Sequence, residues 1–349
     1  MISRLVRTFT SMKIAIYGAY GYQGRLVRAE LARRDAEIIL VGRDAERLAA
    51  VAGGRETRTA AITDHDALVA AFRGAGAVIN CAGPFTPAGT AVVRAAIAAG
   101  CHYTDTSGEQ LHIKRVHDTC SEGARRAGVV ATPAMTDGGV PGDLLARVLA
   151  DHLGGGPLHE VLTGHSVTGG AGMSRGSMRS LLGTADVVRS GGLAYEGGEW
   201  RTEARPRLTS LTFPGRGPVP MSRFALPEVV SVPRHIEVQH VQGFVEADLA
   251  AQFSGAVPEE AVDAFPENPD AEARRGQRWA VLVRAGTPDG RRATAFAEGS
   301  DTYGTTAAIA AEGTLRLSGP PGVRAPAEVL DPAAFLNALA PTGTTWKIT

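Results

Sequence analysis

The sequence predicts an α/β protein in which a doubly wound parallel sheet is followed by a second, α+β domain. Its 349 residues exceed the length at which a single hydrophobic core usually stops growing, so about two domains are expected. The first 135 residues alternate short β-branched runs with helical patterns, which is typical of parallel strands joined by crossover helices. From about Asp137 longer strand-like runs follow. We expect the parallel sheet over residues 12–136, the second domain over 137–300, and a C-terminal helical segment, 301–349, packing back on the first domain.

The N-terminal elements follow from the apolar runs and from the turns between them. Connections of only a few residues favour compact strand–helix–strand units. The expected strands are Lys13–Tyr17, Glu37–Val41, Thr57–Ile62, Ala77–Cys81, Tyr103–Thr104 and Val129–Thr132. The expected helices are Gly24–Arg33, Ala45–Ala52, His65–Phe72, Ala88–Ala99 and Glu109–Ala127.

The second part of the chain is marked by a tract from Pro206 to Pro233 that holds six prolines. The segment Thr287–Gly290 reads TPDG, in which Pro presets φ and Gly accepts a left-handed conformation. It predicts an antiparallel hairpin between Trp279–Arg284 and Arg292–Ala297. Alternation at Ile236, Val238 and Val241 predicts a further strand, and the remaining helices are expected at Thr305–Leu317 and Pro332–Leu339.

Composition excludes several classes of function. The 36 basic and 36 acidic side chains cancel, and no run of five basic residues occurs, so a nucleic-acid partner is not expected. Three cysteines, Cys81, Cys101 and Cys120, without a CxxC spacing argue against a disulfide framework or a cysteine-built zinc site and favour a reducing cytoplasm. The histidine spacings predict no metal site. No apolar run approaches the length of a membrane span, and the basic, acid-free segment 1–11 is expected to be either an extension before the first strand or a short transit peptide.

A glycine-spaced loop, G-x-x-G-x-x-G, follows the first strand at Gly18–Gly24. Between a strand and an amphipathic helix, this spacing predicts a Rossmann dinucleotide site. The first glycine allows the tight turn, the second admits the pyrophosphate, and the third lets the helix pack closely. The expected cofactor contacts in this loop are Gly18, Tyr20, Gly21, Tyr22, Gln23 and Gly24.

The end of the second strand predicts which dinucleotide binds. It reads Val41-Gly42-Arg43, with a guanidinium where an NAD-binding chain would have a carboxylate for the ribose 2′-OH. Because a 2′-phosphate is strongly anionic, Gly42 and Arg43 predict NADP. Asp44 is either the N-cap of the next helix or a ribose ligand.

Two further motifs stand at the carboxyl edge of the predicted sheet. One is Asn80-Cys81-Ala82-Gly83-Pro84-Phe85, and the other runs from Cys101 to Glu109 as CHYTDTSGE. Together with the glycine loop they resemble the saccharopine dehydrogenase-like oxidoreductases, a likeness that covers Lys13 to about Gly142 and returns near Tyr303. The resemblance implies hydride transfer with NADP(H), a homodimer, and cofactor contacts by Cys81, Ala82, Gly83, Pro84, Phe85, Asp105, Ser107 and Gly108.

The candidates for chemistry lie in a cleft expected between the two domains. No tyrosine has a lysine four residues later, so the Tyr-x-x-x-Lys pair of short-chain dehydrogenases is absent from the sequence. Tyr303 and His165 are the candidate proton donors, each with a purely structural role as the alternative. Arg175 is a candidate for holding a carboxylate or phosphate. The expected substrate contacts are Arg175, Ser174, Asp137 and Glu109.

The acceptor of the hydride stays open at this level. The resemblance leaves the acceptor bond undecided among C=N, C=C and C=O. The chain has only three lysines, so a substrate with two carboxylates would have to rely on arginine, and we favour reduction of a C=C bond in an enoyl lipid or polyketide intermediate, with saccharopine reductase-type imine chemistry on an amino acid as the alternative. An apolar cleft would favour the first and a cleft with several arginines the second. A non-catalytic NADP-binding scaffold is the third alternative.

Overall fold

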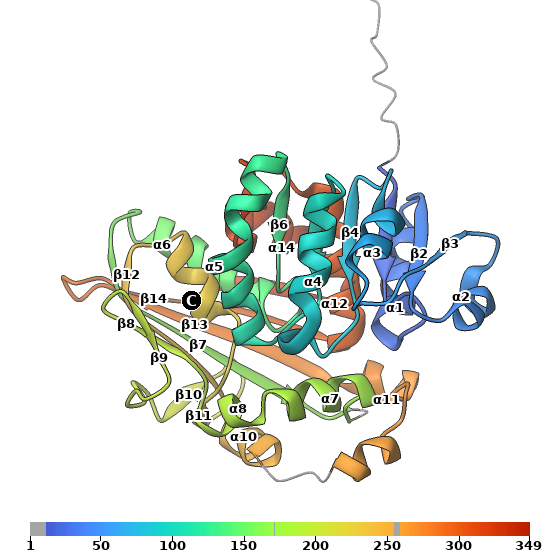
Figure 1. The fold of residues 1–349 in the computed structure, drawn as a ribbon. Coiled ribbons are helices and arrows are strands. Elements are labelled where there is room, and N and C mark those ends of the chain that lie inside the picture. Colours follow the sequence, from blue (N-terminus) through green and yellow to red (C-terminus); the bar gives the residue numbers. More distant parts are fainter. Residues whose placement is uncertain (1–11, 171, 255–258) are drawn as a thin grey trace, which may run out of the picture.

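The computed structural model describes residues 12–170, 172–254 and 259–349, and it contains two sheets with helices packed between and around them (Figure 1). The segment 1–11, expected to precede the first strand, lies outside the described residues. Among the described residues, no helix is both long and apolar enough to span a membrane.

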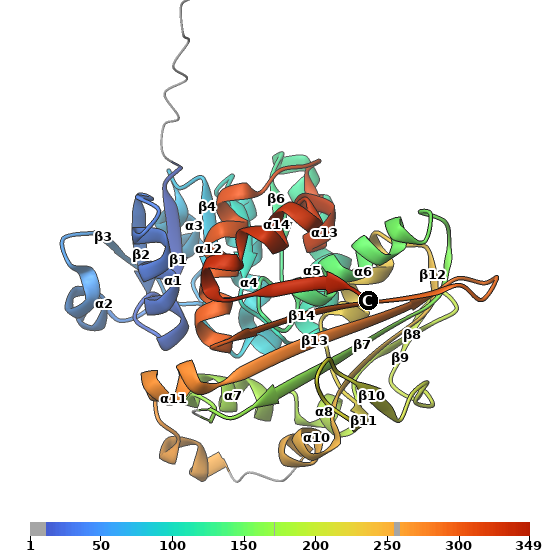
Figure 2. The ribbon, with the colours of Figure 1, turned by 180° about the vertical axis from the view of Figure 1, so that it is seen from behind.

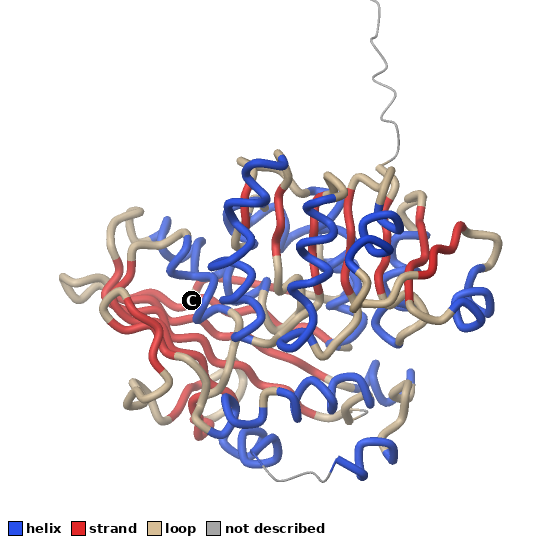
Figure 3. The backbone as a smooth tube through the Cα atoms, viewed as in Figure 1, coloured by secondary structure: helices blue, strands red, loops and turns tan. Residues whose placement is uncertain are grey.

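The first sheet has seven parallel strands in the order β15-β6-β5-β4-β1-β2-β3. The chain runs outward from β1 to β3 on one side and from β4 to β6 on the other, so the crevice for a ligand opens between β1 and β4. Both sides of this sheet are covered by helices (Figure 3), which is why the central strands β1, β2 and β4 are buried and largely apolar, whereas the edge strand β3 is polar and mostly exposed. Its strands are β1 (Ile14–Tyr17), β2 (Ile38–Gly42), β3 (Glu56–Thr59), β4 (Ala77–Asn80), β5 (His102–Asp105), β6 (Val130–Thr132) and β15 (Gly322–Val323).

The crossover helices begin and end close to the predicted positions. α2 and α3 have the predicted bounds, and each has an aspartate N-cap: Asp44 accepts from the Arg47 N–H at 3.0 Å and Asp64 from the Ala67 N–H at 3.0 Å. The N-cap role of Asp44 is therefore the one that the structure supports. The helices are α1 (Tyr22–Ala32), α2 (Ala45–Ala52), α3 (His65–Phe72), α4 (Phe85–Ala98) and α5 (Gln110–Ala127).

The second sheet has nine strands and is mixed. Its centre is β7, which pairs in parallel with β12 and antiparallel with β13. The predicted hairpin is present as β13 and β14, closed by a bond from the Thr287 N–H to the Arg291 carbonyl. The strands are β7 (Leu158–Thr168), β8 (Ala194–Glu196), β9 (Glu199–Arg201), β10 (Ser210–Thr212), β11 (Pro218–Arg223), β12 (Val238–Glu246), β13 (Arg278–Gly286), β14 (Arg292–Ser300) and β16 (Thr345–Ile348).

The C-terminal segment differs from the expectation of a helical stretch. β15 extends the first sheet beside β6, whereas β16 pairs with β14 in the second sheet. Figure 2 shows α12, α13 and α14 against the first sheet and the last strand running across to the second sheet. The remaining helical elements are α6 (Val140–His152), α7 (Arg175–Gly183), α8 (Ala185–Arg189), α9 (Glu228–Ser231), η1 (Val232–Arg234), α10 (Ala247–Ser254), η2 (Glu259–Ala264), α11 (Ala271–Gly276), α12 (Thr302–Arg316), α13 (Pro326–Val329), α14 (Pro332–Ala338) and η3 (Ala340–Thr342).

One hydrophobic core joins the two sheets. Ile16 of β1, Leu145 of α6, Val281 of β13 and Ile309 of α12 are all buried in the same cluster. Apolar burial is the main stabilising contribution to folding, so α6 and α12 act as the shared layer between the sheets.

These observations confirm the predicted fold class, a doubly wound parallel sheet with a second domain of mixed α and β structure.

Candidate active site

A cavity of ≈1150 Å³ lies between the carboxyl edge of the first sheet and the second sheet. Single-ligand pockets commonly measure about 300–1,000 Å³, so this cavity lies above the upper end of that range. Most of the residues expected from the sequence to bind cofactor or substrate line it. They are Gly18, Tyr20, Gly21, Tyr22, Gln23, Gly42, Arg43, Cys81, Ala82, Gly83, Pro84, Phe85, Gly108, Glu109, Asp137, His165, Ser174, Arg175 and Tyr303.

The glycine loop is shaped for an anion. Gly18 has φ +80°, and a Cβ there would stand 2.9 Å from the Ala82 Cβ. A Cβ on Gly24 would overlap the Gly18 carbonyl, so this glycine serves close packing and does not line the cavity. Gly21 N-caps α1 without a side-chain hydrogen bond, and the described first turn of α1 contains no acidic residue. Its free N–H groups and the helix dipole fit a pyrophosphate.

Two arginines lie where the second strand meets the cavity. Arg43 is exposed and makes no hydrogen bond or ion pair with any described residue. The Arg47 guanidinium lies 4.6 Å from the centre of the Tyr20 ring, and a Cβ on Gly42 would stand 2.6 Å from that ring. An unpaired guanidinium beside an aromatic surface fits a 2′-phosphate and the base next to it.

Asp105 and Ser107 were expected from the sequence to contact the cofactor, but neither is among the residues that line the cavity. The fully buried Asp105 carboxylate accepts from the Tyr103 hydroxyl at 2.9 Å and from the Ala134 N–H at 2.9 Å, and it lies 2.8 Å from His112 Nε2. Ser107 Oγ accepts from the Glu109 N–H at 3.0 Å. The motif that contains them therefore shapes the loop after β5 from inside the protein.

Glu109 also has a different role from the expected substrate contact. Its two carboxylate oxygens accept from the Phe85 N–H at 2.8 Å and the Thr86 N–H at 2.6 Å. Both N–H groups belong to the first turn of α4, where an anion is favourable. Glu109 thus caps a helix that begins 24 residues before it and holds the Gly83–Phe85 wall of the cavity.

The Arg175 guanidinium is likewise bound by other residues of the protein. Its guanidinium donates to the Phe265 carbonyl at 3.1 Å and the Asp263 carbonyl at 3.0 Å, and it lies 3.6 Å from the Glu267 carboxylate. In this arrangement Arg175 ties segment 263–267 to α7, and the expected role in holding a substrate anion is not supported. Ser174 is the N-cap of α7, accepting from the Ser177 N–H at 3.1 Å.

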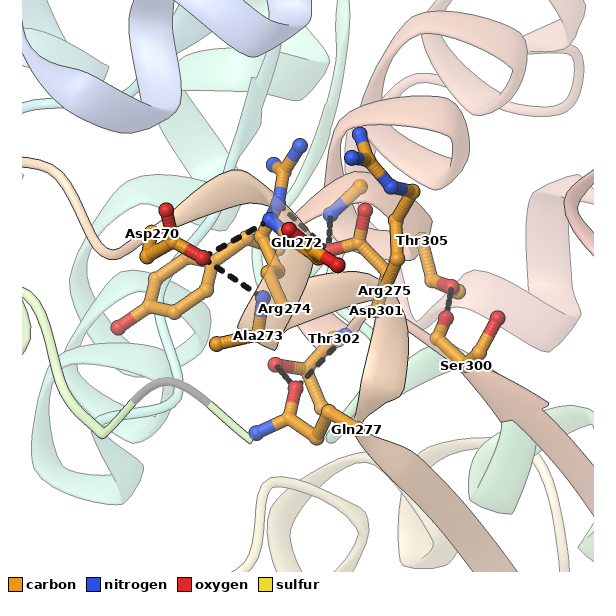
Figure 4. Close-up of polar contacts among 12 residues, drawn as sticks. Asp270, Glu272, Ala273, Arg274, Arg275, Gln277, Ser300, Asp301, Thr302 and Thr305 are labelled. Atoms are coloured by element: carbon orange, nitrogen blue, oxygen red, sulfur yellow. Dashed lines mark hydrogen bonds and ion pairs between the residues drawn. The ribbon is translucent and has the colours of Figure 1, made fainter. Parts of the chain in front are cut away.

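Tyr303 stands at the start of α12 and links the two parts of the protein. Its hydroxyl accepts from the Ser174 N–H at 2.9 Å and lies 2.8 Å from Ser177 Oγ, while its ring packs edge-on against Tyr22 of the glycine loop. Figure 4 shows how the start of this helix is held. Asp301 caps α12 through the Gly304 N–H at 2.8 Å and pairs with Arg274 at 3.2 Å, and Gln277 accepts from Thr302 at 2.7 Å.

Replacing Tyr303 by Phe is expected to leave kcat for a reaction at this site within about threefold of wild type. The hydroxyl is already bonded to α7, so its loss should lower stability by about 1 kcal/mol, the usual contribution of one hydrogen bond. Steady-state kinetics and chemical denaturation measure the two effects. Tyr195→Phe, which removes a hydroxyl outside the cavity lining, is the control. A loss of 100-fold or more in kcat would instead make Tyr303 the proton donor.

His165 and Asp137 are an imidazole and a carboxylate that line the cavity among the expected site residues. His165 lies on β7, is 8% exposed, and its Nε2 is 2.7 Å from the Glu228 Oε1 on α9. Asp137 follows β6, and its Oδ1 accepts from the Thr306 hydroxyl at 2.7 Å. Burial raises the pKa of Asp137 to about 6, against the lowering effects of Thr306 and of His165. An imidazole and a carboxylate thus both line the cavity.

Cys81 is present in the wall as an inert residue. Burial raises the pKa of its thiol to about 12, so the thiolate is not available near neutral pH.

The end of the cavity beyond His165 is apolar. Val245 of β12 is the register partner of His165, and the Phe224 and Phe253 rings are 5.6 Å apart. The apolar residues of this end are Leu111, Leu181, Val187, Val188, Phe224, Leu226, Val245, Leu249 and Phe253. Charged residues that line the cavity near them include Glu246 and Asp248, both acidic, and Arg179, which lies two residues before Leu181 and pairs with Asp263 at 3.1 Å.

Sequence reasoning did not identify Glu228 or this apolar end. One signal was available for Glu228, because it stands as a lone carboxylate within the run LPEVVSV at 226–232, a pattern typical of a buried polar group. The apolar residues come from separate elements and carry no local motif.

Comparisons with known proteins agree with this architecture. Residues 14–131 match the family model of the saccharopine dehydrogenase NADP-binding domain. A Mycobacterium tuberculosis protein named as a trans-acting enoyl reductase is 35% identical over 145 residues, covering 39% of this chain and 35% of the relative. A lipid droplet localized protein of Caenorhabditis elegans is 28% identical over 189 residues, covering 48% of this chain and 44% of the relative. The matches thus span less than half the length of these relatives.

The fold comparison extends over nearly the whole chain. The solved structure of saccharopine dehydrogenase (L-Glu forming) from Saccharomyces cerevisiae matches with a TM-score of 0.60 and 14% identity, covering 97% of this chain and all of that one. The family model agrees with the predicted resemblance and with the predicted cofactor, NADP. Residues 14–131 are therefore similar to the saccharopine dehydrogenase NADP-binding domain, within a chain that shares the fold of the solved saccharopine dehydrogenase.

Proposed function

We propose that the protein is an NADPH-dependent reductase that adds a hydride and a proton across a C=C bond conjugated to a carbonyl, in a substrate with an apolar acyl chain. The observation that carries this proposal is the division of one cavity into a cationic end and an apolar end, with His165 and Asp137 on the wall. The relatives named as enoyl reductases support the same acceptor.

In this proposal the cationic end of the cavity binds the cofactor rather than a substrate carboxylate. The arginines that line the cavity come from the glycine-loop helix, from the end of β2, from α2 and from α7. Several of them meet segment 263–268: Arg25 contacts Asn268, while Arg47 and Arg175 both approach Glu267. An amino-acid imine substrate would need free cations at the other end, where Glu246 and Asp248 are acidic and Arg179 is paired with Asp263.

The residues of the chain have distinct tasks in this reaction. NADPH, when bound, supplies the hydride. The glycine loop binds its pyrophosphate, Arg43 the 2′-phosphate, and the apolar residues around Phe224 exclude water from the acyl chain. His165 gives a proton to the carbon next to the carbonyl after hydride has been added at the other carbon. Asp137 is placed to influence that proton transfer electrostatically.

The test measures NADPH oxidation at 340 nm with trans-2-decenoyl-N-acetylcysteamine, an enoyl thioester, as the substrate. We expect turnover with NADPH, much slower turnover with NADH, and a decanoyl thioester as the product. The saturated decanoyl thioester is the control, because it offers no C=C bond. Oxidation of NADPH by 2-oxoglutarate with L-lysine, but not by the thioester, would replace the enoyl reaction with imine chemistry.

A further inference from the structure

A fully buried glutamate stands directly behind the histidine of the cavity. Glu228 Oε1 lies 2.7 Å from His165 Nε2, and Glu228 is 0% exposed. Its other oxygen, Oε2, is buried without a hydrogen-bond partner among the described residues. Removing a carboxylate from water is unfavourable unless another group compensates its charge, so the burial of Glu228 has to be explained by its partners.

The fold makes room for this carboxylate. A Cβ on Gly142 would overlap the Glu228 carboxylate, so only a glycine at that position of α6 leaves the space. Gly142 lies in the first turn of a 13-residue helix, where the dipole favours an anion. Burial raises the pKa of Glu228, while His165 lowers it. His165 is therefore the principal partner of the buried charge.

The bond to Nε2 decides which nitrogen of His165 serves the cavity. A neutral imidazole carries one proton, and a carboxylate at Nε2 keeps that proton on Nε2. The Nδ1 atom makes no hydrogen bond with any described residue, and His165 lines the cavity. Nδ1 is thus left to exchange a proton with a bound molecule.

We propose that Glu228 is the positioning residue of the site: it keeps a proton on His165 Nε2, stabilises the imidazolium, and leaves Nδ1 as the proton-transferring atom. The catalytic part of this inference rests on the proposed reductase function, whereas the position of the proton does not.

A second buried pair supplies a matched control. Asp143 Oδ1 lies 2.8 Å from His235 Nε2, as close as the Glu228 pair. Asp143 Oδ2 accepts from the Ala327 N–H at 2.9 Å, and neither Asp143 nor His235 is among the residues that line the cavity. This pair has the same chemistry in a structural setting. The Asp143 charge also raises the pKa of Glu228, so its removal favours the Glu228 carboxylate and does not weaken the His165 pair.

The first measurement is ¹⁵N NMR of histidine side chains in the full chain saturated with NADP⁺, assigned with His165→Gln. We expect His165 Nε2 to be protonated in the wild type. In Glu228→Gln, which keeps the side-chain size, we expect the proton to redistribute between the two ring nitrogens, with no such change in Asp143→Asn. An unprotonated Nε2 in the wild type would overturn the inference, because Glu228 would then be the donor.

The second measurement is steady-state kinetics with the enoyl thioester. Glu228→Gln should lower kcat at least tenfold with KM and the Kd for NADPH within twofold, and the double variant with His165→Gln should be no slower than His165→Gln alone. Equal losses of kcat in Glu228→Gln and Asp143→Asn would mean that Glu228 has only a structural role. If the wild type does not reduce the thioester, the proposed function fails, and the NMR result still decides which nitrogen carries the proton.

Discussion

Replacing His165 by Gln is expected to lower kcat for the enoyl thioester at least 100-fold while the Kd for NADPH stays within twofold. A positioned general acid contributes about 10²–10⁴ in rate, and glutamine retains a hydrogen-bonding group without an exchangeable acid. His165 is on β7, away from the glycine loop that binds the dinucleotide, so cofactor affinity should not depend on it. Stopped-flow kinetics and fluorescence titration give the two quantities.

The control for this prediction is His159→Gln, on the same strand but outside the cavity lining. It should leave kcat unchanged. If His165→Gln retains more than a tenth of the wild-type kcat, the proton comes from another group, and Asp137, whose pKa is raised to about 6, becomes the first candidate.

Replacing Arg43 by Ala is expected to raise the Kd for NADPH at least tenfold and to leave the Kd for NADH within twofold. Arg43 is exposed at the cavity edge and is not paired with any described residue, so its guanidinium is free for the 2′-phosphate that only NADPH carries. A hydrogen bond to a charged group contributes about 1.5–3 kcal/mol, which corresponds to a factor of about 10 to 100. Fluorescence titration of both nucleotides measures the change.

Arg94→Ala is the matched control, since Arg94 is an exposed arginine of α4 outside the cavity lining. Its removal tests whether the loss of any positive charge weakens NADPH binding. Equal weakening of NADPH and NADH in Arg43→Ala would mean that Arg43 does not read the 2′-phosphate.

Local patterns predicted the first sheet well. α2 and α3 have the predicted bounds because an aspartate N-cap and an apolar stripe lie within one short segment. The glycine loop was predictable for the same reason, since the positive φ of Gly18 and the close packing at Gly24 are properties of a few consecutive residues.

The roles of several polar residues could not be predicted in this way. Asp105, Glu109 and Arg175 have the residue types of a binding site, yet each is occupied by partners that other elements supply. The same limit applies to β16, a short strand that joins the second sheet only because β14 presents an open edge.

By itself, the sequence determined the doubly wound sheet, the glycine loop, the preference for NADP and the presence of His165 and Asp137 as candidates. Only the tertiary structure decided that Glu228, 63 residues from His165, is its partner, and that the walls beyond them are apolar. Backbone conformation and capping depend on neighbours within a few residues. The partner of a buried charge and the polarity of a cavity depend instead on how distant segments pack. A buried charged group has lost its contacts with water and is stable only where packing brings a compensating group beside it.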